Sequence, residues 1–199
     1  MKRYSMLTLV ILASALGLSQ SPAIGQQAFV VKPLAEKKVT ELPAGPLFWR
    51  LENFPALAQA QAAVGPAALA AESRGKIWLF TLGPPGGASA GGTKVAEIGP
   101  IPRVVATQYL LRINEGSGPP GSITPVHSHP GSEAFYVLAG ESSSRTAHGV
   151  MRVGANESAT GHGADTPMQL SSTGPVDLQS LVMFVVDASK PFSSPASFP

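Results

Sequence analysis

His127 and His129 lie two residues apart, and Glu133 follows four residues after the second histidine. Side chains at positions i and i+2 of a β-strand point to one face, so the two imidazoles are expected side by side. The Pro-Gly-Ser run at 130–132 is expected to turn the chain, after which Glu133 opens the next strand. The spacing predicts two imidazoles and one carboxylate that converge at the mouth of an apolar cavity.

Two histidines and a carboxylate with open positions are the protein ligands of a divalent transition metal. This donor set suits Fe(II), and Mn, Ni and Zn are also compatible with it. Phe135 and Val137 share the face of Glu133 if the strand alternates regularly, so they are the predicted apolar lining of a substrate pocket. A polar loop followed by a solvated strand start is the plainer interpretation of each residue alone, but the combination favours a metal.

The elements that must position these residues are mostly strands. The chain has 21 Gly and 19 Pro, which indicates many turns, and its second half alternates short apolar or β-branched runs with turn residues. Regular spacing of this kind predicts an antiparallel sandwich or barrel. The expected strands are 47–51, 76–82, 104–113, 123–128, 134–139, 141–146, 150–153, 168–171 and 178–187.

The region before residue 100 differs from the second half in its residue composition and periodicity. Residues 26–45 lack periodicity and are expected to form an extended arm. Two Ala-rich runs, 56–64 and 67–72, predict two short helices separated by a Gly-Pro break, with Asn53 as a helix cap. We expect these helices to pack against one end of the sheet, although a lid over the barrel or a dimer contact is an alternative.

The run from Gly121 to Gly140 resembles the first conserved motif of the cupin superfamily at every fixed position: Gly121, His127, His129, Glu133 and Gly140. The resemblance implies an all-β, cupin-type antiparallel β-barrel of jelly-roll type, with the two histidines and Glu133 as metal ligands. It covers about residues 100–190. The expected organisation is a signal peptide (1–25), an N-terminal extension with strands and short helices (26–99) and the barrel (100–199).

The second cupin motif is degraded in this chain. Met168 stands where the resemblance implies a fourth, histidine ligand, and Asp165 and Ser172 replace a glycine and an asparagine. Three interpretations follow: a three-ligand site, a site completed by His162, or a fold that has lost its metal. We favour the first, because the soft thioether of Met168 suits packing better than ligation of a hard metal, and His162 lies in a glycine-flanked turn.

The resemblance implies chemistry on a small organic molecule that reaches the open metal positions. Dioxygenase-like chemistry is favoured narrowly over the reaction of an isomerase or lyase. A non-catalytic module that binds a small ligand is the alternative, and the degraded second motif favours it. A purely structural cupin is the third interpretation, since fold alone does not fix function.

The N-terminus reads as a secretory signal peptide. Lys2 and Arg3 precede an apolar run at 6–18, and small residues permit cleavage near Gly25. The expected location is therefore the periplasm or the exterior, with no membrane anchor after cleavage. Removing both charges leaves 12 basic and 12 acidic residues, which argues against nucleic acid as a partner. The chain has no cysteine, and a homodimer is the expected assembly.

Overall fold

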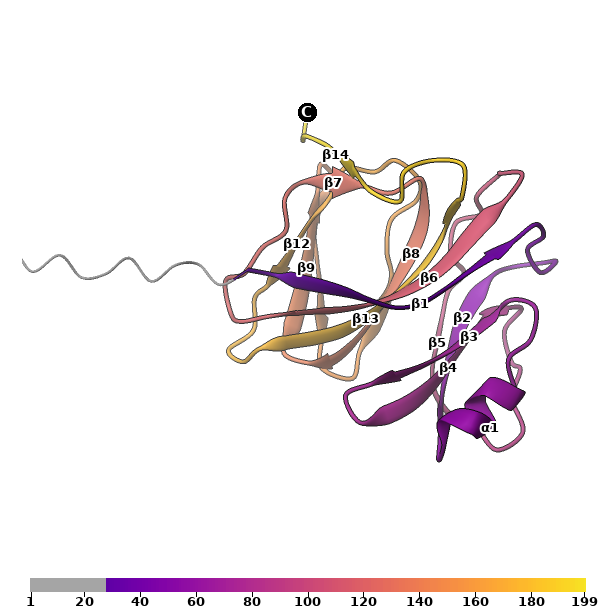
Figure 1. Cartoon of the computed structure of the whole chain (residues 1–199). Helices are drawn as coiled ribbons and strands as arrows, with labels where there is room; N and C mark the ends of the chain where they lie inside the picture. Colours follow the sequence, from indigo (N-terminus) through magenta and orange to yellow (C-terminus); the bar gives the residue numbers. More distant parts are fainter. Residues whose placement is uncertain (1–27) are drawn as a thin grey trace, which may run out of the picture.

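The computed structural model describes residues 28–199, which fold almost entirely into antiparallel strands (Figure 1). A five-stranded sheet in the order β1-β6-β13-β8-β11 faces a three-stranded sheet, β10-β9-β12. Side chains from both sheets meet in shared apolar clusters, such as Leu170 of β12 with Phe135 and Val182. The two sheets form an antiparallel barrel of the jelly-roll type that the motif implied, so the predicted all-β fold class is confirmed.

The strands of the barrel and its rim are β1 (Val30–Val39), β6 (Tyr109–Gly118), β7 (His127–Ser128), β8 (Gly131–Ala139), β9 (Glu141–Thr146), β10 (Gly149–Gly154), β11 (Ser158–Thr160), β12 (Gln169–Ser172), β13 (Leu178–Asp187) and β14 (Ser194–Pro195). A further sheet, ordered β3-β4-β2-β5, consists of β2 (Phe48–Phe54), β3 (Ala68–Ser73), β4 (Lys76–Gly83) and β5 (Thr93–Ile98), with helix α1 (Leu57–Ala62).

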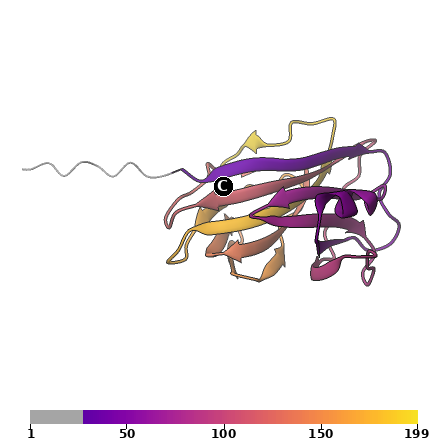
Figure 2. The same ribbon diagram turned by 60° about the horizontal axis from the view of Figure 1, so that its bottom comes forward.

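The five-stranded sheet is buried on both faces, which explains why β13 reads as an almost continuous apolar run. Leu181, Met183 and Val185 point to the four-stranded sheet and join its core. The alternate residues Val182 and Phe184 point into the barrel. Figure 2 shows β1, β6 and β13 running side by side in this central layer. The protein is therefore built in three layers, with the five-stranded sheet in the middle.

The Ala-rich runs form one helix and one strand, so the prediction of two helices was half wrong. Leu57–Ala62 is helical, whereas 67–72 falls almost entirely within β3. Leu69 contributes to the large core and Ala68 to the cluster under α1, so burial on both faces overrides the helix propensity of alanine. Asn53 is not a helix cap. It lies in β2 and its amide donates to the carbonyl of Ile77 (3.3 Å).

The segment predicted as an extended arm contains β1, which pairs with β6 at the edge of the five-stranded sheet. The pairing shifts between Pro33 and Ala35, as expected for a proline on an edge strand. The largest apolar cluster also joins residues from both sides of position 100, among them Trp78 and Leu181. The four-stranded sheet (48–98) and the barrel thus share one core.

Three strand boundaries near the motif differ from the predictions. β8 begins at Gly131 and pairs with β13 from that residue onward, so Gly131 and Ser132 belong to the strand and not to a turn before Glu133. The strand predicted at 104–113 is β6, which runs from Tyr109 to Gly118. The strand continues through Gly116 and Gly118 because β13 packs closely against it. A Cβ at Gly116 would lie 2.8 Å from Ser180 Oγ, so this close packing favours glycine. Of the predicted strand 123–128, only His127–Ser128 forms β7, and Ile123 makes a single bridge to Ser171.

The predicted signal peptide, 1–25, lies outside the described residues. Within residues 28–199, no helix has the length and apolar character required to span a membrane.

Candidate functional site

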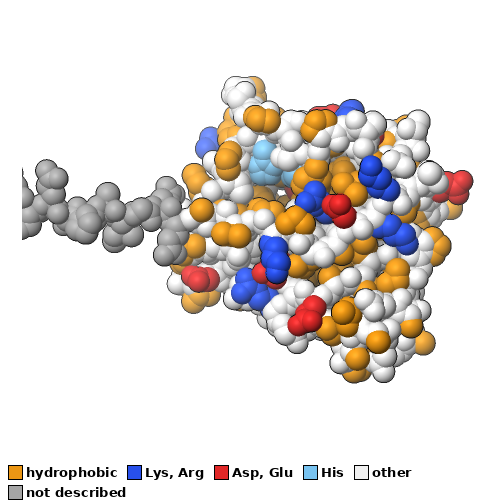
Figure 3. All heavy atoms as spheres, viewed as in Figure 1, with side chains coloured by type: hydrophobic (Ala, Val, Ile, Leu, Met, Phe, Trp, Pro, Cys, Tyr) orange, Lys and Arg blue, Asp and Glu red, His pale blue; other side chains and the backbone are white. Residues whose placement is uncertain are grey.

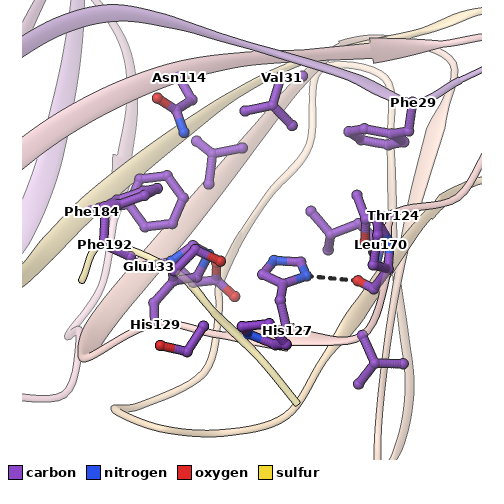
Figure 4. Close-up of a pocket in the computed structure, with 17 residues that line it drawn as sticks. Phe29, Val31, Asn114, Thr124, His127, His129, Glu133, Leu170, Phe184 and Phe192 are labelled. Atoms are coloured by element: carbon purple, nitrogen blue, oxygen red, sulfur yellow. Dashed lines mark hydrogen bonds between the residues drawn. The ribbon is translucent and has the colours of Figure 1, made fainter. Parts of the chain in front are cut away.

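A cavity of about 470 Å³ opens inside the barrel next to the three motif residues (Figure 4). Figure 3 shows histidine side chains at the surface on this side of the molecule, next to hydrophobic ones. Apolar side chains make up most of the wall. The lining residues are Phe29, Val31, Asn114, Gly116, Thr124, Pro125, Val126, His127, His129, Glu133, Leu170, Val182, Phe184, Phe192, Ser193, Ser194 and Pro195.

The two histidines lie side by side at the cavity, with ring centroids 5.0 Å apart and ring planes at 83°. His127 is on β7 and is held by backbone hydrogen bonds in both directions with Met168 (2.9 and 2.8 Å). Its Nδ1–H donates to the carbonyl of Pro125 (2.9 Å), and the Nδ1–H of His129 donates to the carbonyl of Phe192 (2.7 Å). Because a carbonyl only accepts, each Nδ1 is protonated and each Nε2 keeps its lone pair in the neutral ring.

Glu133 lies on β8 and is almost completely buried at the cavity wall. Neither of its carboxylate oxygens has a hydrogen-bond partner among the described residues. Gly161, which directly follows β11, covers the side chain: its backbone N–H donates to the Glu133 carbonyl (2.9 Å), and a Cβ on it would clash with Glu133 Cγ. Burying a charged carboxylate without partners costs free energy. Glu133 is therefore stabilised by binding either a proton or a cation.

Burial favours the neutral forms of both Glu133 and His129. Desolvation raises the pKa of Glu133 to about 8, and the nearby backbone N–H of His162 opposes the rise without forming a hydrogen bond of normal geometry. Desolvation also lowers the pKa of His129 to about 4; the hydrogen bond to Phe192 opposes this, and the charges of His127 and Arg112 add to it. Without a bound cation, the site therefore holds a neutral imidazole and a protonated carboxyl at neutral pH.

The three predicted ligands share one cavity, yet they do not form a finished coordination shell. Among residues 28–199, no group of three or more His, Asp or Glu side chains is arranged closely enough to hold a metal ion. The donor types still fit a divalent metal, because two Nε2 lone pairs and an unpartnered carboxylate face the same space. Ligation by all three would need their side chains to move closer together.

His162 and Met168, the two additional candidates, do not line the cavity. The half-buried ring of His162 shares a hydrogen bond between its Nε2 and Ser144 Oγ (3.1 Å), and burial lowers its pKa, with His148 adding to the effect. The Met168 side chain is fully buried, and its backbone pairs with that of His127. The backbone N–H of His162 lies near the Glu133 carboxyl. The buried Met168 side chain packs in the interior.

Phe135 and Val137 point to the barrel interior, as the alternation of β8 predicts, but they lie outside the cavity lining. Phe135 packs with Leu170 and Val182, which are themselves in the wall. Val137 packs lower in the barrel with Val153 and Leu178. The two residues support the apolar wall from behind.

A C-terminal strap, residues 191–199, closes one side of the cavity, and the sequence interpretation missed it. Its strand β14 pairs with β7, so that Pro195 lies opposite His127. The Phe192 ring packs against His129 and Phe184, with centroids 4.7 and 4.9 Å away. The only sequence signal was an isolated Phe among Pro and Ser residues, which does not reveal a partner 63 residues away.

Sequence-based comparison gives no relatives: no family model and no curated protein matches this chain. Solved structures resemble it over part of its length. A conserved protein of unknown function from Streptococcus pyogenes is 24% identical over 38% of this chain and 64% of its own, with a TM-score of 0.35. A cupin superfamily protein from Desulfitobacterium hafniense is 14% identical over 39% and 68%, also with a TM-score of 0.35.

A DMSP lyase from Ruegeria pomeroyi is a third similar structure. It is 22% identical over 43% of this chain and 43% of the lyase, with a TM-score of 0.37. The chain thus spans less than two thirds of the length of the Streptococcus protein and of the lyase.

Proposed function

We propose that this cupin-fold protein binds one divalent transition metal through His127, His129 and Glu133 and acts on a small organic molecule in the adjoining cavity. The observation that carries the proposal is Glu133, whose two carboxylate oxygens are buried without partners beside two imidazoles. A divalent cation would satisfy the carboxylate and accept the imidazole lone pairs. Iron is the first choice for this donor set, with Mn, Ni and Zn as alternatives.

The backbone supports the proposed ligands in a way that suits metal binding. Histidine ligands usually donate their second N–H to a carbonyl or carboxylate, which fixes the tautomer and the ring orientation. Here the carbonyls of Pro125 and Phe192 accept from His127 and His129. The two histidines that would hold the metal therefore already have outer partners.

A bound metal of this kind would supply Lewis-acid activation or a site for O2 beside the substrate. The chain's own residues would orient and shield that substrate. Phe184, Phe192 and Leu170 exclude water from the cavity wall, and Glu133 holds a proton on its carboxyl whenever no cation is present. The apolar wall suits an uncharged or aromatic substrate, and we place dioxygenase-like chemistry ahead of isomerase or lyase chemistry.

A non-catalytic module that binds a small ligand is the second candidate function. The observation that favours it is the absence of a ready-made metal cluster within residues 28–199, combined with a largely apolar cavity. Such a module would hold its ligand in the same cavity without turning it over.

Metal analysis distinguishes the two functions. Protein purified without a His tag or chelator would be measured by elemental mass spectrometry, beside His127→Ala, His129→Ala and Glu133→Ala variants. His148→Ala is the matched control, because His148 lies at the β9–β10 turn outside the cavity. Near-stoichiometric metal that only the control variant retains supports the proposal, and oxygen uptake with candidate substrates then follows. Folded protein that takes up no Fe, Mn, Ni or Zn would leave the ligand-binding module.

The proposed location is the periplasm or the exterior, after removal of residues 1–25, with a homodimer as the proposed assembly. Mass spectrometry of the N-terminus of the exported protein tests the cleavage site. Light scattering on the purified mature chain tests the dimer, and a monomeric mass would contradict it.

A further inference from the structure

Asn114 brings a polar group to a wall of the cavity that is otherwise apolar. It lies on β6, whereas the two imidazoles come from β7 and the connection after it. Its side chain is 2% exposed and lines the cavity beside Val31 and Val182. A polar side chain buried at such a position is normally hydrogen-bonded, so its partners decide its role.

The orientation of the Asn114 amide is fixed by Arg112, two residues earlier on the same face of β6. The Arg112 Nε–H donates to Asn114 Oδ1 (3.2 Å), and a guanidinium only donates, so the amide oxygen must be the atom that faces it. Arg112 is held in turn by the Phe192 ring, 4.3 Å from its Cζ, and by Glu36 (3.7 Å). The amide NH2 group is then the part that turns into the cavity (Figure 4).

Within residues 28–199, the hydrogen bond that Oδ1 accepts from Arg112 is the only one that the Asn114 side chain makes. The amide nitrogen is not among the fully buried atoms that lack a partner, so it keeps contact with the space of the cavity. The group reaches the cavity and is therefore free to donate to a bound molecule. A buried donor that loses water without gaining an acceptor is penalised, so the cavity discriminates against purely apolar molecules at this position. The lining also contains no Lys or Arg within residues 28–199, which removes the usual partners of phosphate groups.

We infer that Asn114 is a specificity-determining residue and that the ligand of this cavity is a small, largely apolar molecule bearing a carbonyl oxygen, which accepts a hydrogen bond from the Asn114 amide. The inference rests on the proposed function only in taking this cavity as the ligand site. It holds for an enzyme or a binding module, and it does not require a bound metal.

The test uses two probes of equal shape, acetophenone and isopropenylbenzene, which differ in carrying C=O or C=CH2. Their Kd values would be measured by NMR titration of the full mature protein in the presence of a chelator. The quantity of interest is the ratio of the two Kd values in each variant, because it cancels general hydrophobic affinity. Asn114→Leu should reduce the preference for the ketone by roughly two- to tenfold, the range of one net hydrogen bond.

Asn114→Asp serves as the second variant, because it keeps the shape and the contact with Arg112 but presents an acceptor in place of the NH2 group. It should also reduce the preference for the ketone. Val182→Ala is the control: it enlarges the apolar wall and should weaken both probes by a similar factor. A preference that survives in both Asn114 variants overturns the inference, as does failure of wild-type protein to bind acetophenone. Metal content, measured separately, decides the proposed function.

Discussion

Glu133 is the residue whose environment departs furthest from that of an ordinary glutamate. Its carboxyl is buried, unpartnered and adjacent to two imidazoles, one of which is itself held neutral by burial. A neutral His129 imidazole and a protonated Glu133 carboxyl are the forms that burial favours at neutral pH when no cation is bound. The proposed metal binding would therefore replace the proton of Glu133 with a cation.

The raised pKa of Glu133 predicts a pH-dependent stability of the metal-free protein. Native Glu133 keeps its proton up to about pH 8, whereas the unfolded chain loses it near the ordinary value of 4.5. The native state therefore binds more protons in this range, and the free energy of unfolding falls as pH rises toward 8. His129 acts in the opposite sense, but only between pH 4 and its ordinary pKa of 6.5.

Between pH 6.5 and 8 the fall due to Glu133 should therefore stand alone. Urea unfolding at several pH values in this window, with chelator present, measures the slope. Glu133→Gln should abolish most of it, while His148→Ala should leave it intact. An unchanged slope in Glu133→Gln would show that the carboxyl titrates normally in the folded protein.

Gly161 gives a second prediction, based on space. A Cβ at this position would clash with Glu133 Cγ and would lie 2.6 Å from Phe135 Cε2, so Gly161→Ala must displace both side chains or the backbone of residue 161. Overpacking of this kind lowers the free energy of unfolding by about 1–3 kcal/mol. Gly163→Ala is the matched control, because its nearest contact would be an ordinary 3.8 Å to Pro102. Equal midpoints of urea unfolding for the two variants would contradict the prediction.

The sequence identified the three charged or titratable residues at the cavity but not its other polar contributors. His127, His129 and Glu133 are recognisable from their spacing alone. Asn114 has a neighbouring signal, since Arg112 and Asn114 alternate on one face of β6, but strand alternation does not say which face meets the cavity. The strap was beyond prediction because its contacts with β7 depend on how the whole barrel closes.

At the scale of elements, the C-terminal strap connects barrel closure to the state of His129. The carbonyl of Phe192 accepts from His129 Nδ1, and the Phe192 ring covers the imidazole. The strap is pinned by strand pairing with β7 and by the backbone N–H of Ala196, which donates to the Val126 carbonyl (3.1 Å). It therefore controls both the orientation and the exposure of one proposed ligand.

Deleting residues 191–199 should expose His129 and remove its acceptor. Since burial is the main cause of its low pKa, we expect that pKa to rise from about 4 toward 6.5, measured by NMR titration of the metal-free protein. Metal affinity should fall about 10- to 100-fold, as for loss of an outer-shell partner. Deleting only 197–199 leaves Phe192 and β14 in place and should change neither quantity. A pKa that stays near 4 after the longer deletion would show that the strap does not bury His129.

The strands that the sequence predicts best are those with one clear pattern. The strands at 141–146 and 178–187 match β9 and β13 in both bounds, because turn residues bracket them closely. The predictions fail for segments whose secondary structure is determined by tertiary contacts. Ala68–Ser73 forms a strand because β4 pairs with it, and β1 forms because β6 offers a free edge, neither of which is visible in local sequence.

At the scale of the whole molecule, the four-stranded sheet and the barrel share one apolar core, and we expect them to unfold as one cooperative unit. Their contact is made by large apolar side chains, including Trp49, Trp78, Leu181 and Met183, all with 0% exposure. Separating the two layers would expose this surface to water at about 25 cal/mol per Å² of apolar area. The central sheet would then lose its cover on one face, so neither layer is expected to unfold alone.

The two tryptophans of the chain, Trp49 and Trp78, both lie in this shared core, so their fluorescence reports on the four-stranded sheet while far-UV circular dichroism reports on all sheets. For one cooperative unit, the two signals should give the same urea midpoint. Trp78→Ala should lower the free energy of unfolding by about 3–5 kcal/mol, and the remaining fluorescence and the dichroism should still shift together. Val105→Ala, at a side chain 95% exposed, should leave the midpoint unchanged. A fluorescence transition that precedes the dichroism transition would instead mean that the four-stranded sheet melts off an intact barrel, and the cavity would then be independent of residues 48–98.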